Sequence, residues 1–152
     1  MLIKMKNTNL KQYIVLLCLG ILLNACGNSN ETKKDVPAVK VDPMTDKGIG
    51  PVNQVTLSPV DPGMVAEGQK IYKEKCTSCH NPVKKLLGPP HQGIMSRRTP
   101  EWIMNMMLNP QQMLEKDPIA IQLLKEYNDV PMTNQDLKQE EARKILEYFR
   151  TL

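Results

Sequence analysis

The chain has 152 residues, a formal net charge of +4 and only 4% aromatic residues, with one Trp and one Phe. This length suits a single small domain, whose modest core would need further buried bulk. No aromatic side chains interleave with the basic residues, which argues against nucleic-acid binding.

The N-terminal segment has the pattern of an export signal. A basic stretch with three lysines precedes an apolar run of 11 residues, Tyr13 to Leu23. This run is too short to span a membrane as a helix and suits the apolar region of a signal peptide. It ends in Leu23-Asn24-Ala25-Cys26, which resembles the lipobox of bacterial lipoproteins. The resemblance implies a signal peptide of residues 1–25 and lipidation of Cys26. The alternative is an ordinary secretory signal with an incidental cysteine.

Lipidation would anchor the mature protein to a bacterial membrane on the extracytoplasmic side. Several acyl chains anchor a protein stably, whereas one chain binds only marginally. We expect a periplasmic protein. By resemblance to sorting in Gram-negative cells, the absence of aspartate directly after Cys26 favours the outer membrane. In a Gram-positive cell the same signal would mean the outer face of the only membrane.

Residues 26–62 are predicted to form the lipidated N-terminus and a proline-rich tether. The segment contains five prolines, together with Gly48 and Gly50, and shows no sustained apolar periodicity. Such a composition buries too little apolar surface to offset the entropy of ordering the chain. We therefore predict a flexible tether. The alternative is a partly ordered extension that wraps on the domain.

Residues 63–152 are predicted to form one small all-α domain of about four helices. Three helix starts are marked by a capping residue followed by proline, and no segment alternates like a strand. The first predicted helix runs from Asp61-Pro62 to about Lys75, and the second from Thr99-Pro100 to just before Asn109. The third begins at Asp117-Pro118 and includes the apolar run that follows. The last begins between about Asp136 and Lys138 and continues to the end of the chain.

Residues 76–80 read Cys-Thr-Ser-Cys-His, the pattern for covalent haem attachment. Cys76 and Cys79 can each add to a vinyl group of the porphyrin, and His80 then becomes an axial ligand of the iron. The predicted cofactor is one covalent haem c. Three alternatives compete with it. A thioredoxin-like pair lacks flanking strands, a zinc site is one ligand short even with His91, and a structural disulfide leaves His80 unexplained.

A second axial ligand is expected on the other face of the iron. Four methionines lie on or beside predicted helices, where this residue is more often core filling. Met132 differs, because it lies in a loop between the third and last predicted helices, 52 residues beyond His80 and directly after Pro131. A loop ligand can approach the iron from the face opposite a helix-borne histidine. The chain between His80 and His91 is short, so His91 is expected to be buried or to bond a propionate rather than bind iron.

Residues 64–152 resemble class I cytochromes c, the small single-haem electron carriers. The haem motif follows a helix that contains Gly68 and Tyr72. In the family, a glycine and an aromatic residue at this spacing pack on aromatic residues of the C-terminal helix, here Tyr148 and Phe149. The resemblance implies the same helix pair in this chain.

The resemblance also implies contacts to the haem. Pro89, in a Gly-Pro pair like that of the family, would lie near the proximal imidazole, and a backbone carbonyl would accept the imidazole N–H. Trp102 would pack on the haem near the propionates. Met132 matches the distal methionine of the family.

A six-coordinate iron held by His80 and Met132 has no open site. The function that follows is one-electron transfer through the haem edge, with no catalytic residues. The expected partners are redox proteins (an oxidase, a reductase or a quinol-oxidising complex), and the expected state is a monomer. The alternatives are a five-coordinate haem sensor of small gas ligands and a fixed haem subunit of a larger reductase or oxidase.

Basic residues gather around the haem motif. Residues 70–98 hold seven lysines and arginines against Glu74 alone. A positive rim near the electron exit would steer docking to an acidic partner surface. The alternative is an ordinary solvated face whose field the haem propionates partly cancel.

Overall fold

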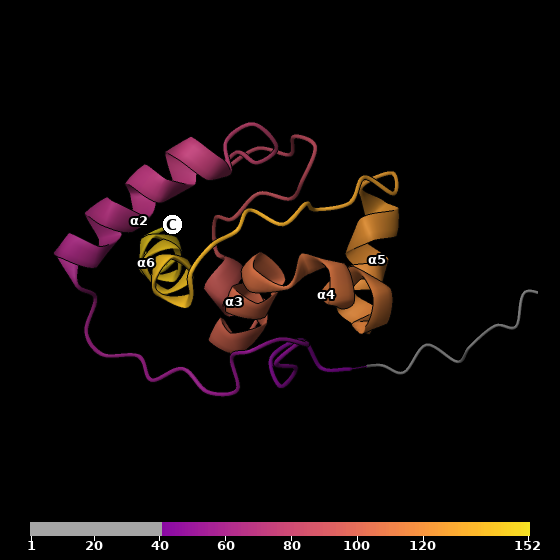
Figure 1. Ribbon diagram of the computed structural model, residues 1–152, viewed down its shortest axis with the longest axis horizontal. Helices are drawn as coiled ribbons and strands as arrows, with labels where there is room; N and C mark the ends of the chain where they lie inside the picture. Colours follow the sequence, from indigo (N-terminus) through magenta and orange to yellow (C-terminus); the bar gives the residue numbers. More distant parts are fainter. Residues whose placement is uncertain (1–40) are drawn as a thin grey trace, which may run out of the picture. The chain divides into compact units, whose positions relative to one another are not determined.

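The computed structural model describes residues 41–152. Within that range all regular structure is helical and there is no strand, so the all-α prediction is confirmed (Figure 1). The elements are α2 (Pro62–Lys75), the short 3-10 helix η1 (Ile94–Ser96), α3 (Pro100–Leu108), α4 (Pro110–Lys116), α5 (Pro118–Glu126) and α6 (Gln139–Phe149).

Three helices begin where their capping residues predicted. The carboxylate of Asp61 accepts from the N–H groups of Gly63 and Met64 at the start of α2. The hydroxyl of Thr99 caps α3, and the carboxylate of Asp117 accepts from the Ala120 N–H at 2.7 Å in α5. Each cap is followed by a proline, whose fixed φ suits the first helical position.

Helix α4 was not predicted. The Asn109-Pro110 pair ends α3, as expected, but Pro110 also occupies the first position of a new helix. The last helix begins where it was predicted, with Lys138 as its N-cap residue and Gln139 as its first helical residue, and Asp136 just before it has a left-handed φ of 49°. The helix ends at Phe149 rather than at the last residue.

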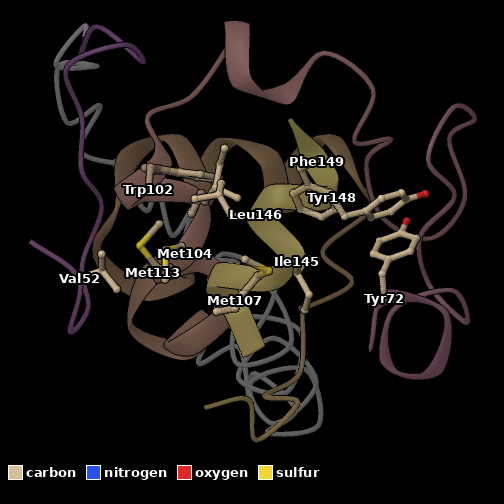
Figure 2. Close-up of a cluster of buried hydrophobic side chains, with 13 residues drawn as sticks. Val52, Tyr72, Trp102, Met104, Met107, Met113, Ile145, Leu146, Tyr148 and Phe149 are labelled. Atoms are coloured by element: carbon tan, nitrogen blue, oxygen red, sulfur yellow. The ribbon is translucent and has the colours of Figure 1, made fainter. Parts of the chain in front are cut away.

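Helices α2 and α6 pack against each other at close range (Figure 1). A Cβ on Gly68 would lie 1.9 Å from the carbonyl oxygen of Lys144, so only glycine permits this approach. One turn further along α2, the Tyr72 ring lies 5.5 Å from the Tyr148 ring and 5.7 Å from the Phe149 ring. Figure 2 shows Tyr72 and Tyr148 side by side. The expected helix pair is therefore present.

The rest of the core is rich in methionine. Met104, Met107 and Met113 are buried with Trp102 between the helices (Figure 2), as expected for methionines on helices. The flexible, unbranched methionine side chain fills irregular space between such short helices.

The described part of the predicted tether is ordered, which matches the alternative of an extension that wraps on the domain. Residues 46–58, called the strap below, lie along α3 and α4 (Figure 1). Val52 is only 3% exposed, and both its backbone N–H and its carbonyl bond to the Asn105 side chain at 2.9 Å. The low apolar content misled the prediction, because polar side chains of α3 satisfy the extended backbone. The predicted lipidation site Cys26 and the tether up to residue 40 lie outside the described residues.

None of the helices in residues 41–152 combines the length and the apolar character needed to cross a bilayer.

Candidate functional site

A cavity of about 580 Å³ opens beside the end of α2. This volume falls within the range of pockets that hold a cofactor-sized ligand. The predicted haem residues Cys76, Cys79, His80 and Met132 all line it, although they come from two segments far apart in the chain. Apolar side chains complete most of the wall, among them Leu87, Ile94, Ile103, Met106, Met107, Leu114, Leu123 and Phe149.

The haem motif turns sharply where α2 ends. The N–H of Cys76 bonds to the Tyr72 carbonyl at 2.9 Å, and the N–H groups of Cys79 and His80 both bond to the Cys76 carbonyl. This turn brings both cysteines and the imidazole to one wall of the cavity. Cys76 and Cys79 are free thiols rather than a disulfide.

The environment of Cys76 differs from that of a redox-active cysteine pair. Burial raises its pKa to about 11, and the neighbouring Cys79 adds to the rise while Lys75 opposes it. Thioredoxin-like sites instead lower the pKa of the attacking cysteine to produce a thiolate. The thioredoxin-like alternative therefore lacks support at this site.

The His80 ring is held from two sides. Its Nδ1 lies 3.0 Å from the Pro89 carbonyl oxygen, which accepts the ring N–H. This is the hydrogen bond that the family resemblance implied, and it leaves Nε2 as the lone-pair nitrogen for a metal. A Cβ on Gly88 would lie 2.2 Å from His80 Cε1, so the glycine gives the ring its space. Burial lowers the pKa of His80, which favours the neutral imidazole that ligates metals.

Met132 lies in the loop between α5 and α6. It is half-buried, packs against the core and lines the same cavity as His80. The structure therefore brings the two predicted axial ligands to one cavity. Met106, from α3, also lines it.

Trp102 lines the cavity, as expected for a residue that packs on the haem, and its indole N–H has a protein acceptor. It donates to Asp117 Oδ1 at 3.2 Å, and the ring is only 3% exposed. The Arg98 guanidinium lies over the ring, 5.2 Å from its centroid. Trp102 is thus placed to pack on a cofactor, while its N–H already has a protein acceptor.

His91 lies on the same side of the cavity as His80. Their ring centroids are 4.7 Å apart. Two imidazoles on opposite sides of one metal need more room, because each nitrogen stands about 2 Å from the metal. The His91 ring stacks on Phe149 at 4.4 Å, and its Nδ1 lies 3.1 Å from the Tyr72 hydroxyl. Burial lowers its pKa to about 3, and His80 and Arg97 add to this effect.

Sequence reasoning missed the pairing of Tyr72 with His91 and the role of Asn105. The first pair spans 19 residues across a loop, a separation that carries no periodic signal. The role of Asn105 could have been predicted from the sequence. Glu101, Asn105 and Asn109 follow a four-residue spacing on an otherwise apolar helix, and all three bond to the strap.

Across residues 41–152, no three His, Cys, Asp or Glu side chains gather into a metal-binding group. The zinc alternative therefore has no ligand set in this part of the chain, because a structural zinc site uses four such ligands.

The comparison with known families agrees with this site. The sequence profile of the family described as Cytochrome c matches residues 65–152. The chain belongs to the cytochrome c family. This family binds covalent haem c, typically one per domain, and functions in haem-based electron transfer. Cys76 and Cys79 are the candidate attachment residues. No curated protein gives a significant match.

Several solved cytochromes c have the same fold. Cytochrome c from Rhodothermus marinus is 40% identical with a TM-score of 0.65, covering 67% of this chain and 88% of its own. An engineered form of that protein, bound to a carbene intermediate, is 39% identical with a TM-score of 0.62, covering 67% of this chain and 88% of its own. The cytochrome c domain of the pp3183 protein from Pseudomonas putida is 31% identical with a TM-score of 0.52, covering 55% of this chain and 85% of its own.

The residues on the cavity wall fit a haem c. Two free thiols can form the thioethers, and His80 has a free Nε2 because Nδ1 is bonded to Pro89. The thioether sulfur of Met132 and the apolar wall match the needs of a low-polarity haem pocket.

Proposed function

We propose that this protein is a membrane-tethered one-electron carrier whose haem c is held by Cys76 and Cys79 and ligated by His80 and Met132. The observation that carries the proposal is the presence of all four side chains on the wall of one cavity. When bound, the haem supplies the one-electron redox chemistry. It would pass electrons between respiratory-chain partners outside the cytoplasm, and the protein would not act as an enzyme.

The side chains contribute attachment, orientation and exclusion of water. The Pro89 carbonyl holds His80 in one tautomer and raises the basicity of Nε2. The sulfur of Met132 would be the second protein ligand of the iron, and a thioether ligand would raise the reduction potential relative to bis-histidine ligation. The apolar wall keeps water away from the site and so limits the reorganisation that accompanies electron transfer.

The Met132→Ala variant tests the ligation. We expect the reduced variant to bind carbon monoxide readily and its reduction potential to fall by at least about 60 mV, a tenfold change in the one-electron equilibrium constant. The matched control is Met106→Ala, since Met106 lines the same cavity from α3. It should keep the spectrum and potential of the wild type. A Met132→Ala protein with an unchanged spectrum and potential would show that Met132 is not a ligand.

The same experiment separates the carrier from the five-coordinate sensor. A sensor would bind carbon monoxide equally well before and after the Met132 substitution, because its iron would already be open. A fixed haem subunit of a larger reductase or oxidase would differ from a free carrier in assembly only. Co-purification of the haem domain with a stable membrane complex would favour that alternative.

The proposed anchor is a lipidated Cys26 on the extracytoplasmic side of a bacterial membrane. The support is the lipobox-like sequence that precedes it. The wild type should partition into the detergent phase, and a Cys26→Ser variant should move to the aqueous phase. Retention of the variant in detergent would contradict lipid anchoring at this residue.

A further inference from the structure

Two side chains, Tyr72 of α2 and His91, link this helix to the predicted iron ligand His80. Neither has a role in the electron transfer proposed above. The Tyr72 hydroxyl reaches His91 Nδ1 at 3.1 Å, and the His91 ring lies 4.7 Å from the His80 ring. Tyr72 is 1% exposed, and it packs where α2 meets α6. The contact between the helices therefore continues through His91 to His80.

The available donors and acceptors determine which group donates in the Tyr72–His91 hydrogen bond. A buried hydroxyl hydrogen needs an acceptor, and His91 Nδ1 is the partner that Tyr72 has among the described residues. Burial raises the pKa of Tyr72, with Cys76 and Tyr148 contributing further, so the hydroxyl keeps its proton. Tyr72 therefore donates to Nδ1, and the His91 hydrogen lies on Nε2.

The His91 ring has little freedom to turn. One face stacks on Phe149 with an interplanar angle of 12°. Its backbone N–H bonds to the Pro82 carbonyl at 3.0 Å, and the next residue, Gln92, bonds to the same carbonyl at 2.8 Å. The backbone hydrogen bond, the stacked Phe149 ring and the hydrogen bond from Tyr72 together hold the His91 ring in one position.

The His80 ring lies against the His91 ring. Its ring is tilted 40° to His91, while Gly88 meets its Cε1 edge and the Pro89 carbonyl holds Nδ1. The Pro89 bond fixes the direction of the ring N–H. Contacts to the ring itself limit its remaining movement, and His91 makes such a contact.

On the basis of the haem ligation proposed above, we propose that Tyr72 and His91 form a hydrogen-bonded pair that positions the His80 ring. The pair sets the rotation of the axial imidazole, and through it the packing of α2 on α6 reaches the iron site. Both are positioning residues, because they act on the metal through His80.

The test is electron paramagnetic resonance of the oxidised holoprotein, because the g values of a low-spin ferric haem respond to the rotation of its axial imidazole. We expect Tyr72→Phe and His91→Leu to shift the g values. In the double variant the shift should not exceed the larger single shift, since both side chains act along one path. The control is Tyr148→Phe, which removes a hydroxyl from the same aromatic cluster without touching His91. It should keep the wild-type g values.

Loss of thermal stability alone would not support the proposal, because a purely structural pair would also lower stability. Wild-type g values in Tyr72→Phe, with the His/Met spectrum intact, would overturn it. This variant retains the ring that packs on α6, so the test holds even if His91→Leu folds poorly. If the wild type itself lacked a His/Met spectrum, the proposed ligation would fail first.

Discussion

Asp117 is a buried carboxylate that holds several groups together at the start of α5. It is 2% exposed, and its Oδ1 accepts from the Ala120 N–H and from the indole of Trp102. Burial raises its pKa, and the nearby Asp46 raises it further against the effect of these two hydrogen bonds. Asp46 Oδ2 is itself buried with no hydrogen-bond partner among the described residues. Arg98 is the nearby cation that attracts both carboxylates.

The Asp117 carboxyl should make stability depend on pH. The folded pKa of Asp117 lies above its unfolded value, so the folded state binds the proton more tightly. The stabilisation from that proton is complete below pH of about 4 and is lost as pH rises through the folded pKa. The stability that the Asp117 proton provides therefore falls toward neutral pH.

Asp46→Asn should stabilise the holoprotein at pH 7–8 by on the order of 1 kcal/mol, because it removes one of two facing negative charges. Its side-chain oxygen can still accept from the Gly48 N–H, as in the wild type. Thermal unfolding between pH 4 and 8 measures the effect, and the variant should show the flatter profile. Asp42→Asn is the control, an exposed carboxylate that bonds only to neighbouring backbone. Equal slopes in the wild type and Asp46→Asn would refute the role of the pair.

At the element scale, the strap depends on side chains from α3. Asn105 is 1% exposed and bonds to the backbone of Lys47 and Val52, while Glu101 accepts from the Val55 N–H at 2.9 Å. At the C-terminal end of the strap, the Arg150 guanidinium donates to the Ser58 carbonyl. The strap has no helix or strand of its own, so these bonds replace the partners that regular structure would give its backbone.

Asn105→Ala should loosen the strap. It leaves buried backbone groups without partners, and we expect a loss of about 2–4 kcal/mol in unfolding free energy. Limited proteolysis should cut within residues 46–58 faster than in the wild type, while the haem spectrum should not change. The exposed Gln111, which bonds only to Glu115, gives the control variant Gln111→Ala. Cleavage at the wild-type rate would show that Asn105 does not hold the strap.

The strap also shows which parts of the fold are readable from sequence. Helix starts at Asp61, Thr99 and Asp117 were predictable because caps are local. The haem motif was predictable because its residues are contiguous. Met132 was predicted from its position in a loop before the last helix and from family resemblance, and it lines the same cavity as His80. The strap was only the alternative to a flexible tether, because its order depends on polar partners about 50 residues away rather than on its own apolar content.

At the scale of the whole molecule, the strap shortens the proposed tether. About twenty residues, from Cys26 to residue 45, lie between the proposed lipid anchor and the strap. Fully extended, they would reach at most about 70 Å. The proposed carrier would therefore operate close to its membrane, and its partners should expose their electron-transfer sites within that distance.

The charge near the cavity bears on the choice of partner. Lys75, Arg97 and Arg98 line the cavity, and Lys85 lies over the Tyr127 ring. We propose that this basic rim steers docking to an acidic redox partner. The bimolecular electron-transfer rate with such a partner should fall as ionic strength rises from about 10 mM to about 150 mM, because the Debye length shortens from about 30 Å to about 8 Å. A rate independent of salt would argue for an ordinary solvated surface.

The proposed haem c has one histidine and one methionine ligand. The absorption spectrum of the oxidised wild-type holoprotein, recorded to long wavelength, tests this ligation most directly. We expect a low-spin spectrum with a weak sulfur-to-iron charge-transfer band that disappears in Met132→Ala. A high-spin spectrum without that band would contradict the ligation by Met132 and favour an open iron.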